Sequence, residues 1–335
     1  MTVLVTGAAG FVGFHVAKAL LQRGAKVVGV DNLNSYYDPA LKHARLRQLT
    51  PLAGFTFNEV DVADRAGMTA LVDAYPDIKE IVHLAAQAGV RYSLVDPYAY
   101  VTANVMGHVT VLEAARRLQS LRHLVYASSS SVYGGNTKLP FAEGDPVDTP
   151  VSLYAATKRA DELISHAYAH LHGLPQTGLR FFTVYGPWGR PDMAYYAFAE
   201  AILAGQPITL YEGGTLRRDF TYIDDVVDGV LRCLACPPSG PVPAQVLNIG
   251  NNGSEEVSRL VALLEAALGQ KALLKLVPRP ATDVGETHAD LTRVAAKVGF
   301  SPCTRLEDGI PRFAAWFMEF RKAAKKAVDA TPARA

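Results

Sequence analysis

The sequence has few cysteines, no excess of charge of either sign and no apolar run long enough to span a bilayer. Its 33 Lys and Arg residues are balanced by 32 Asp and Glu residues, so the formal net charge is only +1. This balance gives no reason to expect nucleic acid or a membrane surface as a partner. The first predicted strand starts at Thr2, which leaves no room for a signal peptide, and we expect a cytoplasmic protein.

The three cysteines are Cys233, Cys236 and Cys303. The first two form a C-x-x-C pair, a spacing found in metal and redox sites. However, Cys233 falls in the apolar stripe of a predicted helix, Cys236 stands just before Pro237-Pro238, and no second pair or neighbouring histidine completes a zinc site. We therefore predict no metal site, and the low cysteine content favours a reducing compartment.

Along the sequence, segments whose apolar residues have the period of a strand alternate with segments whose apolar residues have the period of a helix. Predicted strands span residues 3–6, 26–30, 55–60, 80–84, 123–127 and 176–181. Predicted helices span residues 11–23, 39–49, 65–74, 98–118 and 152–172. Strands that alternate with helices form a parallel sheet covered on both faces, so we predict an α/β fold with a doubly wound parallel sheet.

The 335 residues, 49% of them hydrophobic, are enough for two lobes around a cleft. We assign residues 1–180 to the sheet domain and expect residues 219–250 to return to it, because 222–234 is typical of a helix and 245–249 of a strand. Residues 181–218 and 251–320, where glycine and proline are denser, are expected to form a smaller C-terminal substrate lobe. Residues 321–335, rich in Ala, Lys and Arg, are expected to form a flexible tail.

A glycine-rich segment follows the first predicted strand. Gly7, Gly10 and Gly13 lie between an apolar strand and a helix. The first glycine permits the tight turn, the second lets phosphate approach the backbone, and the third lets the helix pack closely on the strand. The amide dipoles at a helix N-terminus attract phosphate. The segment therefore predicts a dinucleotide pyrophosphate site in a Rossmann-type domain.

Asp31 ends the second predicted strand. A carboxylate at this place accepts hydrogen bonds from ribose hydroxyls and repels a 2′-phosphate, which favours NAD over NADP as the cofactor. A strand-end turn residue is the alternative interpretation of Asp31.

Tyr154 and Lys158 are four residues apart in a predicted helix, so both side chains lie on one face. An ammonium group stabilises a neighbouring phenolate, and so does the positive charge of an oxidised nicotinamide. A phenolate placed in this way can deprotonate an alcohol while hydride leaves for the cofactor. A chance Tyr and Lys pair is the alternative, but the glycine segment and the serine run 128–131 at a strand end argue against it.

These features resemble the extended short-chain dehydrogenase/reductases that act on nucleotide sugars. The resemblance covers nearly the whole chain and rests on Gly7-x-x-Gly10-x-x-Gly13, Asp31-Asn32, Asp61-Val62, His83-Leu84-Ala85-Ala86, the segment Ser128 to Gly134, Tyr154-x-x-x-Lys158 and Arg218-Asp219-Phe220. Two longer segments, residues 31–38 and 180–193, resemble those of the UDP-glucuronate 4-epimerases of that family.

The resemblance implies roles for individual residues. Tyr154 would be the base, Lys158 would assist it and hold the nicotinamide ribose, and Ser129 would hydrogen-bond O4 of the sugar. Ser130 is the alternative for that last role, because the serine run leaves the register open. A helix cap is the alternative role for Asp61. The implied NAD contacts, besides Tyr154 and Lys158, are Gly7, Gly10, Phe11, Val12, Gly13, Asp31, Asn32, Asp61, Val62, Leu84, Ala85 and Ala86.

The serine run also separates this sequence from similar enzymes. Sugar-nucleotide 4,6-dehydratases place Asp and Glu directly after the hydroxyl residue, and UDP-glucuronate decarboxylases carry Glu at the second of these places. Here the two places hold Ser130 and Ser131. UDP-glucose 4-epimerases usually have Asn where this chain has Thr183. The resemblance therefore favours a uronate substrate.

Arg190, in Gly-Pro-Trp-Gly-Arg, is the candidate that would bind the uronate. A guanidinium holds a carboxylate through two parallel hydrogen bonds. A 4-keto uronate loses carbon dioxide when the breaking bond aligns with the ketone, and Arg190 with Thr183 would hold the carboxylate misaligned. A surface residue in a turn is the alternative for Arg190. Arg218 and Arg279 are candidates for the diphosphate, although the usual spacing from Arg279 to the acidic residue, here Asp283, is not well kept.

We therefore expect a UDP-sugar 4-epimerase with tightly bound NAD that converts UDP-glucuronate to UDP-galacturonate through a transient 4-keto sugar. From the resemblance we also expect a homodimer formed through helices 98–118 and 152–172. A UDP-glucuronate decarboxylase, a UDP-glucose 4-epimerase and an NAD-sensing regulatory protein are the alternatives.

Overall fold

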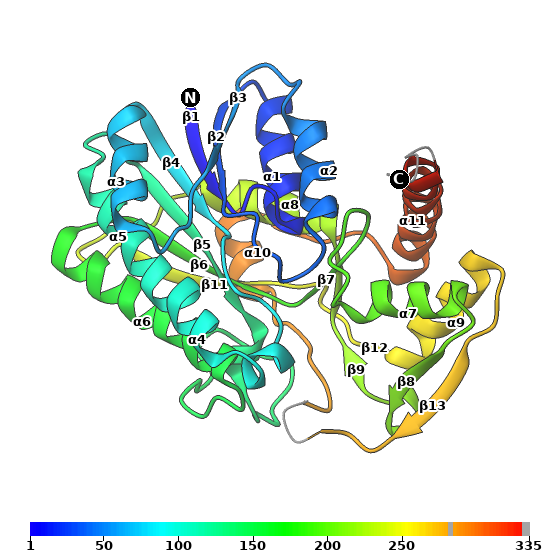
Figure 1. Cartoon of the computed structure of the whole chain (residues 1–335). Coiled ribbons are helices and arrows are strands. Elements are labelled where there is room, and N and C mark those ends of the chain that lie inside the picture. The colour runs from blue at the N-terminus through cyan, green and yellow to red at the C-terminus, as the bar shows by residue number, and fades with distance from the viewer. Residues whose placement is uncertain (281–283, 330–335) are drawn as a thin grey trace.

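The computed structural model describes residues 1–280 and 284–329, which fold into two lobes (Figure 1). The larger lobe is built on a seven-stranded sheet with the order β11-β6-β5-β4-β1-β2-β3, and all neighbouring strands are parallel. The strands are β1 (Thr2–Thr6), β2 (Lys26–Asp31), β3 (Phe55–Glu59), β4 (Ile78–His83), β5 (His123–Ser129), β6 (Gln176–Phe181) and β11 (Ala244–Ile249). The predicted doubly wound parallel fold is confirmed.

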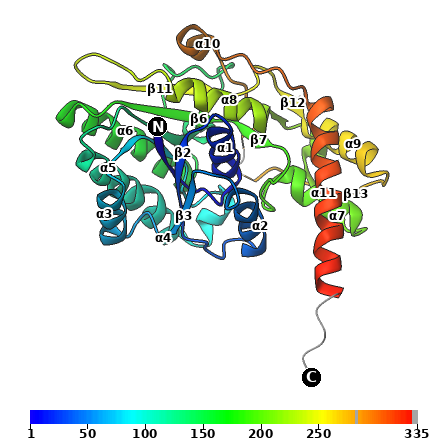
Figure 2. The same ribbon diagram turned by 90° about the horizontal axis from the view of Figure 1, so that it is seen from above.

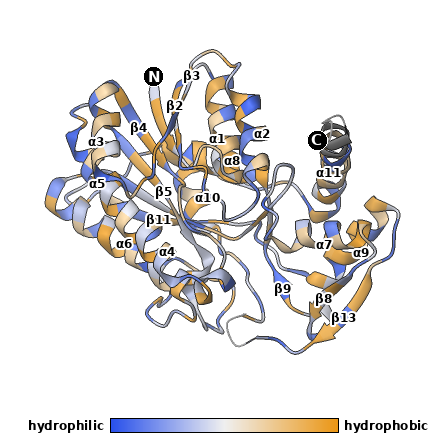
Figure 3. Ribbon diagram, viewed as in Figure 1, coloured by the Kyte–Doolittle hydropathy of each residue, from blue (hydrophilic) through white to orange (hydrophobic). Residues whose placement is uncertain are grey.

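Helices cover both faces of the sheet (Figure 2). Helix α1 (Phe11–Gln22) contacts α8 (Ile223–Leu234), while α3 (Arg65–Ala74), α5 (Gly107–Arg117) and α6 (Leu153–His172) form a second layer. Alternate residues of β1 belong to different apolar clusters, Val3 and Val5 to one and Leu4 to the other. The helices are amphipathic, as the mixed colours of α5 and α6 show (Figure 3).

The predicted helix 98–118 differs from the structure. It consists of α4 (Pro97–Tyr100), a π-helical turn (Val101–Met106) and α5. Asn104, in the π-helical turn, is buried; its side chain accepts a hydrogen bond from Gln87 N (2.8 Å) and donates one to Thr157 Oγ1 (3.0 Å). A π-helical turn is a common way of turning one polar side chain towards a functional site.

The smaller lobe contains three two-stranded sheets, β7–β10, β9–β12 and β8–β13, packed with helices. Its elements are β7 (Thr183–Tyr185), α7 (Ala194–Leu203), β8 (Pro207–Tyr211), β9 (Arg217–Arg218), β10 (Phe220–Tyr222), β12 (Glu255–Glu256), α9 (Val257–Leu268), β13 (Leu273–Val277) and α11 (Leu306–Asp329). Helix α9 contacts both α7 and α11. Buried residues of these three helices belong to the same apolar cluster as one face of the central sheet, and Ile208, Leu210 and Val261 form a small second cluster in this lobe.

Two features differ from the predicted division of the chain. Strand β11 pairs with β6, as expected for a segment that returns to the sheet, but α10 (Thr292–Val298) contacts β11 and so also lies with the larger lobe. Helix α11 continues to Asp329, so the predicted tail is helical up to that residue; residues 330–335 lie outside the described residues. No helix in the described part of the chain is long and apolar enough to cross a membrane.

Candidate functional site

A cavity of about 410 Å³ lies at the carboxyl ends of the central strands, with residues of both lobes in its wall. In doubly wound sheets, ligands bind at this edge, where the strand order reverses. Its volume falls in the roughly 300–1,000 Å³ range of cofactor and small-molecule sites. Its wall includes residues of the glycine segment, the end of β5, the start of α6 and segment 181–193. We call the part lined by Asp31 and Asp61 the adenosine end and the part lined by Tyr154, Thr183 and Arg190 the sugar end.

The glycine segment is too tightly packed to accept side chains. A Cβ atom at Gly13 would lie 2.0 Å from the Gly7 carbonyl oxygen, and one at Gly7 would lie 2.8 Å from Ala85 N. Gly7 has a positive φ of 71°, which glycine adopts readily. Gly10 is the N-cap of α1 and has no side chain to cover the helix amides. The segment therefore has the bare backbone and uncovered helix amides that the predicted pyrophosphate site requires.

Asp31 lies at the end of β2 and is buried in a network of hydrogen bonds. Its carboxylate accepts from Ala9 N (3.2 Å), Leu33 N (2.9 Å) and Lys42 Nζ (3.3 Å). Lys42, on α2 (Pro39–Leu49), lines the cavity and was not identified from the sequence. Asp31 is thus more than a strand-end turn residue: it links the glycine segment to α2 at the adenosine end of the predicted NAD site.

Asn32 and Asp61 contact each other across neighbouring strand ends, with 2.9 Å between Asn32 Nδ2 and Asp61 Oδ2. Asp61 also accepts from Ala63 N (2.8 Å). The N-cap of α3 is Asp64, which accepts from Ala66 N, so the alternative role of Asp61 as helix cap is wrong. Both Asn32 and Asp61 line the cavity.

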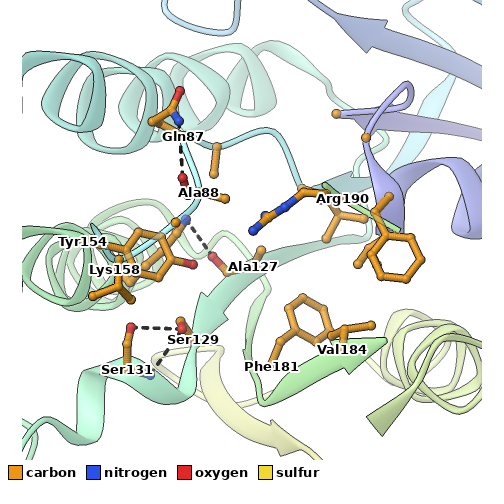
Figure 4. A pocket seen from close by; sticks show the side chains of 18 of the residues that line it. Gln87, Ala88, Ala127, Ser129, Ser131, Tyr154, Lys158, Phe181, Val184 and Arg190 are labelled. Atoms are coloured by element: carbon orange, nitrogen blue, oxygen red, sulfur yellow. Dashed lines mark hydrogen bonds between the residues drawn. The ribbon is translucent and has the colours of Figure 1, made fainter. Parts of the chain in front are cut away.

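Tyr154 and Lys158 lie in the first turns of α6, which starts where the Ser152 hydroxyl accepts a hydrogen bond from Ala155 N (3.1 Å). Both side chains line the cavity and point towards the end of β5 (Figure 4). Lys158 Nζ donates to Ala127 O (3.0 Å) and to Asp161 Oδ2 (3.1 Å). Burial raises the pKa of Asp161 to about 6, against the opposing effect of Lys158.

The serine run turns its hydroxyls in different directions. Ser128 lines the cavity, and its Oγ donates to Glu162 Oε1 on α6 (2.6 Å). Ser129 Oγ accepts from Ser131 N (3.2 Å) and Ser131 Oγ (2.9 Å), and Ser129, Ser130 and Ser131 all line the cavity (Figure 4). Ser129 and Ser130 therefore both remain candidates for the hydroxyl that contacts O4.

Arg190 projects into the cavity from the side opposite Tyr154 (Figure 4). Its Nε and Nη2 donate to the two carboxylate oxygens of Asp192, at 3.0 and 2.9 Å. Burial opposes its charge, but Asp192 outweighs burial and raises the pKa of Arg190 above its ordinary value. Thr183, at the start of β7, lines the same end. Arg190 is therefore a cavity residue rather than a surface residue in a turn.

The two predicted diphosphate arginines differ in position. Arg218 lines the cavity, and its Nη1 donates to the backbone oxygens of Arg217 (2.8 Å) and Gly285 (3.2 Å). Arg279 is not among the described residues that line it; its Nε lies 3.7 Å from Glu212 Oε1. Its Nη1 lies beside Gly285, where a Cβ would be 2.8 Å away, and Gly285 O accepts from Arg218. The diphosphate role of Arg279 therefore stays a prediction, and Asp283 lies outside the described residues. The remaining predicted residues all line the cavity: Phe11, Val12, Val62, Leu84, Ala85 and Ala86.

Arg45 is a further residue that sequence reasoning missed. It is fully buried, and its guanidinium donates to Ala9 O (2.8 Å), Trp188 O (2.7 Å) and Gly189 O (3.1 Å). It thereby ties the glycine segment to the loop that carries Arg190. The sequence did contain a signal for it. Arg45 lies four residues from both Leu41 and Leu49, so it interrupts an otherwise apolar stripe of α2.

Comparisons with known proteins agree with this geometry. The profile of the NAD dependent epimerase/dehydratase family matches residues 3–250. UDP-glucuronate 4-epimerase 5 of Arabidopsis thaliana is 47% identical over 97% of this chain and 77% of the plant protein. A UDP-glucuronic acid 4-epimerase from Bacillus cereus, solved with UDP-glucuronic acid and NAD, is 33% identical, with a TM-score of 0.89 over 96% of this chain and 100% of that chain. A UDP-glucose 4-epimerase from Thermotoga maritima is 28% identical, with a TM-score of 0.86 over 96% and 100% of the two chains.

Proposed function

The chain belongs to the NAD dependent epimerase/dehydratase family, and we propose that it interconverts UDP-glucuronate and UDP-galacturonate at C4 with bound NAD. The observation that carries this proposal is the arrangement of one cavity, with Tyr154 and Lys158 on one side and Arg190 on the other. A base for the C4 hydroxyl and a cation for the C5 carboxylate then face the same sugar from opposite sides.

Each chemical step of the proposed reaction depends on residues that line the cavity. Tyr154 takes the proton of the C4 hydroxyl and later returns it, while Lys158 favours the phenolate and Ser129 or Ser130 holds O4. Bound NAD would accept the C4 hydride and give it back. Arg190 and Thr183 bind the uronate carboxylate in the pose in which C4 is oxidised, and the 4-keto sugar then turns to present its opposite face. Arg218 is the candidate that binds the diphosphate.

The charges around the sugar end favour epimerisation over elimination or decarboxylation. Among the described lining residues the carboxylates are Asp31 and Asp61, and both lie at the adenosine end of the predicted NAD site. The sugar end presents Ser130 and Ser131 where a dehydratase needs an acid and a base. A regulatory protein that only senses NAD would have no use for Tyr154 and Lys158 in this arrangement.

Conversion of UDP-glucuronate in heavy water tests the proposal. The C5 hydrogen of the 4-keto sugar is acidic, so a nearby base would exchange it with solvent. Because none of the described carboxylates that line the cavity is at the sugar end, we expect UDP-galacturonate without deuterium at C5. We also expect none at C4, since the hydride removed there returns. Proton NMR and mass spectrometry of the purified product measure both positions.

The outcomes of this experiment separate the alternatives. Deuterium at C5 would reveal a base that acts at that carbon and would contradict our assignment of the serines. Carbon dioxide as the main product would make the protein a decarboxylase. Faster turnover of UDP-glucose than of UDP-glucuronate would make it a neutral-sugar epimerase, and no turnover of any UDP-sugar would favour the regulatory protein.

The protein is also proposed to form a homodimer. The face formed by segment 91–106 and α6 exposes large apolar side chains: Leu94, Val95, Tyr98, Val101, Met106 and Leu163. Exposed apolar patches on this scale commonly mark interaction surfaces, and a second copy using the same face gives a closed two-fold assembly. Sedimentation equilibrium should therefore give twice the chain mass of 36.0 kDa, and a monomer mass would contradict the proposal.

A further inference from the structure

The two sequence segments that resemble UDP-glucuronate 4-epimerases, residues 31–38 and 180–193, contact each other at the sugar end of the cavity. The contact is a hydrogen bond from the Tyr36 hydroxyl to Asp192 Oδ2, 3.2 Å long. The same carboxylate binds Arg190 through both of its oxygens. Tyr36 and Arg190 line the cavity, whereas Asp192 is not among the described lining residues. Asp192 therefore supports Arg190 from behind, as seen from the substrate.

The way in which Asp192 binds leaves one edge of the guanidinium for another ligand. Arg190 binds Asp192 through Nε and Nη2, the two nitrogens on the side edge of the guanidinium. Nη2 also lies 3.5 Å from Met193 Sδ. Nη1 has no hydrogen bond to any of the described residues. An arginine can bind two carboxylates at once through its side and end edges. A uronate can thus bind the Nη1 edge without displacing Asp192.

The surroundings fix Asp192 in this position. The Tyr36 ring packs against Tyr92 with 4.8 Å between ring centroids. Gly89, with a φ of 97°, makes room for the contact, because a Cβ there would lie 2.4 Å from the Tyr36 hydroxyl and 3.4 Å from Asp192 Oδ2. Burial and the nearby Asp192 charge raise the pKa of Tyr36, so its phenol stays protonated and donates.

Stability alone does not explain this arrangement. The side chains of Arg190 and Asp192 are 23% and 25% exposed. For a pair largely shielded from water, the cost of desolvating both charges offsets much of their attraction, so the pair is weak evidence of a gain in stability. What the pair does fix is the plane and direction of the guanidinium, and a guanidinium held in one plane determines where a bound carboxylate lies.

We propose that Asp192, held by Tyr36, is a positioning residue that orients Arg190 so that the uronate carboxylate stays out of line with the C4 ketone. This inference rests on the proposed function. Without that orientation, the C5–C6 bond of the 4-keto intermediate aligns with the ketone and breaks. Carbon dioxide leaves, the electron pair enters the ketone as an enolate, and a solvent proton at C5 gives the 4-keto pentose. Each such event leaves one cofactor molecule reduced if the ketone escapes.

The test compares the products of Asp192→Asn and Tyr36→Phe with those of the wild-type protein on UDP-glucuronate. We expect Asp192→Asn to raise the ratio of carbon dioxide to UDP-galacturonate about tenfold, the factor that corresponds to about 1.4 kcal/mol. Tyr36→Phe should raise it less, because Asp192 keeps both bonds to Arg190. NADH absorbance should increase in step with the carbon dioxide released.

Three further variants test whether the effect is specific to the contact between Asp192 and Arg190. Arg190→Ala should raise the same ratio at least as much as Asp192→Asn. Asp73→Asn is the matched control, because Arg117 donates to Asp73 through the same side edge, from Nε to Oδ1 (3.2 Å) and from Nη2 to Oδ2 (2.9 Å), and neither residue is among the described lining residues. Its product ratio should equal that of the wild type. In a Tyr154→Phe background, Asp192→Asn should weaken binding of UDP-glucuronate and leave that of UDP-glucose unchanged in calorimetry.

The possible results distinguish a failure of this inference from a failure of the proposed function. An Asp192→Asn variant with the wild-type product ratio would overturn the inference even if its turnover fell. Equal weakening of both UDP-sugars would also overturn it, because Asp192 would then support the fold of the loop rather than the uronate contact. Failure of the wild-type protein to form UDP-galacturonate would contradict the proposed function instead, and that measurement does not involve Asp192.

Discussion

A Tyr154→Phe variant should keep its fold and lose turnover of UDP-glucuronate by at least ~10²-fold, the usual contribution of one acid-base group. The ring that remains still packs edge to face on Tyr100, at 6.0 Å between centroids, so the cavity wall is unchanged. Only the oxygen that takes the C4 proton is lost. The loss should appear in kcat, with little change in the affinity for UDP-glucuronate measured by calorimetry.

Tyr168→Phe is the matched control, because it removes a tyrosine hydroxyl from the same helix. That hydroxyl donates to Glu113 Oε1 (2.7 Å) at the protein surface. Its loss should change kcat by less than about twofold, since surface substitutions usually act within about 0.5 kcal/mol. If Tyr154→Phe also retained near-normal kcat, another group would be the base, and the assignment of Tyr154 would be wrong.

Much of the larger lobe could be predicted from the sequence because its elements carry regular signals. The bounds of α2, α3 and β6 agree with the predicted ranges. Both helices begin directly after a capping aspartate, Asp38 and Asp64, and such caps are local signals. The predicted helix 98–118 is helical from Pro97 to Arg117, but the π-helical stretch within it was not predicted. Asn104 in that stretch contacts Gln87 and Thr157, which are far away in the sequence. Periodicity does not report such long-range contacts.

At the site, too, features set by local sequence could be predicted, whereas features set by contacts between distant residues could not. The motifs identified which residues line the cavity, because glycine spacing and a Tyr and Lys pair act through local geometry. They did not identify what holds those residues. Lys42 on Asp31, Arg45 on the loop carbonyls and Asp192 on Arg190 depend on tertiary contacts. The role predicted for Arg279 at the diphosphate stays a prediction: its Nε lies near Glu212, and its Nη1 lies beside Gly285, whose carbonyl accepts from Arg218.

The serine run depends on a buried ion pair that the sequence analysis did not use. Glu162, on α6, binds Arg180 Nε and Nη2 at 2.8 Å each and accepts from Ser128 Oγ at 2.6 Å. The Arg180 and Glu162 side chains are only 3% and 1% exposed. This network joins α6, which carries Tyr154, to the end of β5, which carries the serines.

Glu162→Ala should lower the free energy of unfolding by about 3–5 kcal/mol, because it leaves the Arg180 charge buried without its main partner. Urea denaturation followed by circular dichroism measures the change. The double variant Glu162→Met with Arg180→Met should recover most of the loss, since apolar side chains of similar volume often replace a buried pair without cost. Glu113→Ala, which removes the exposed partner of Arg116, should cost no more than about 1 kcal/mol.

Acid should reproduce the effect of the Glu162 substitution. Burial by itself would raise the pKa of Glu162, but Arg180, Ser128 and Arg159 outweigh burial and hold it below the ordinary value of 4.5. A carboxyl group with a lowered pKa in the folded state stabilises the fold above pH 4.5, and this contribution is lost as the pH falls through the folded-state pKa. The stability difference between the wild type and Glu162→Ala should therefore be constant near neutral pH and narrow below pH 4.5. A difference that stayed constant into acid would show that the substitution acts through lost packing rather than through the carboxylate, and the ion pair would not be what holds the serine run to α6.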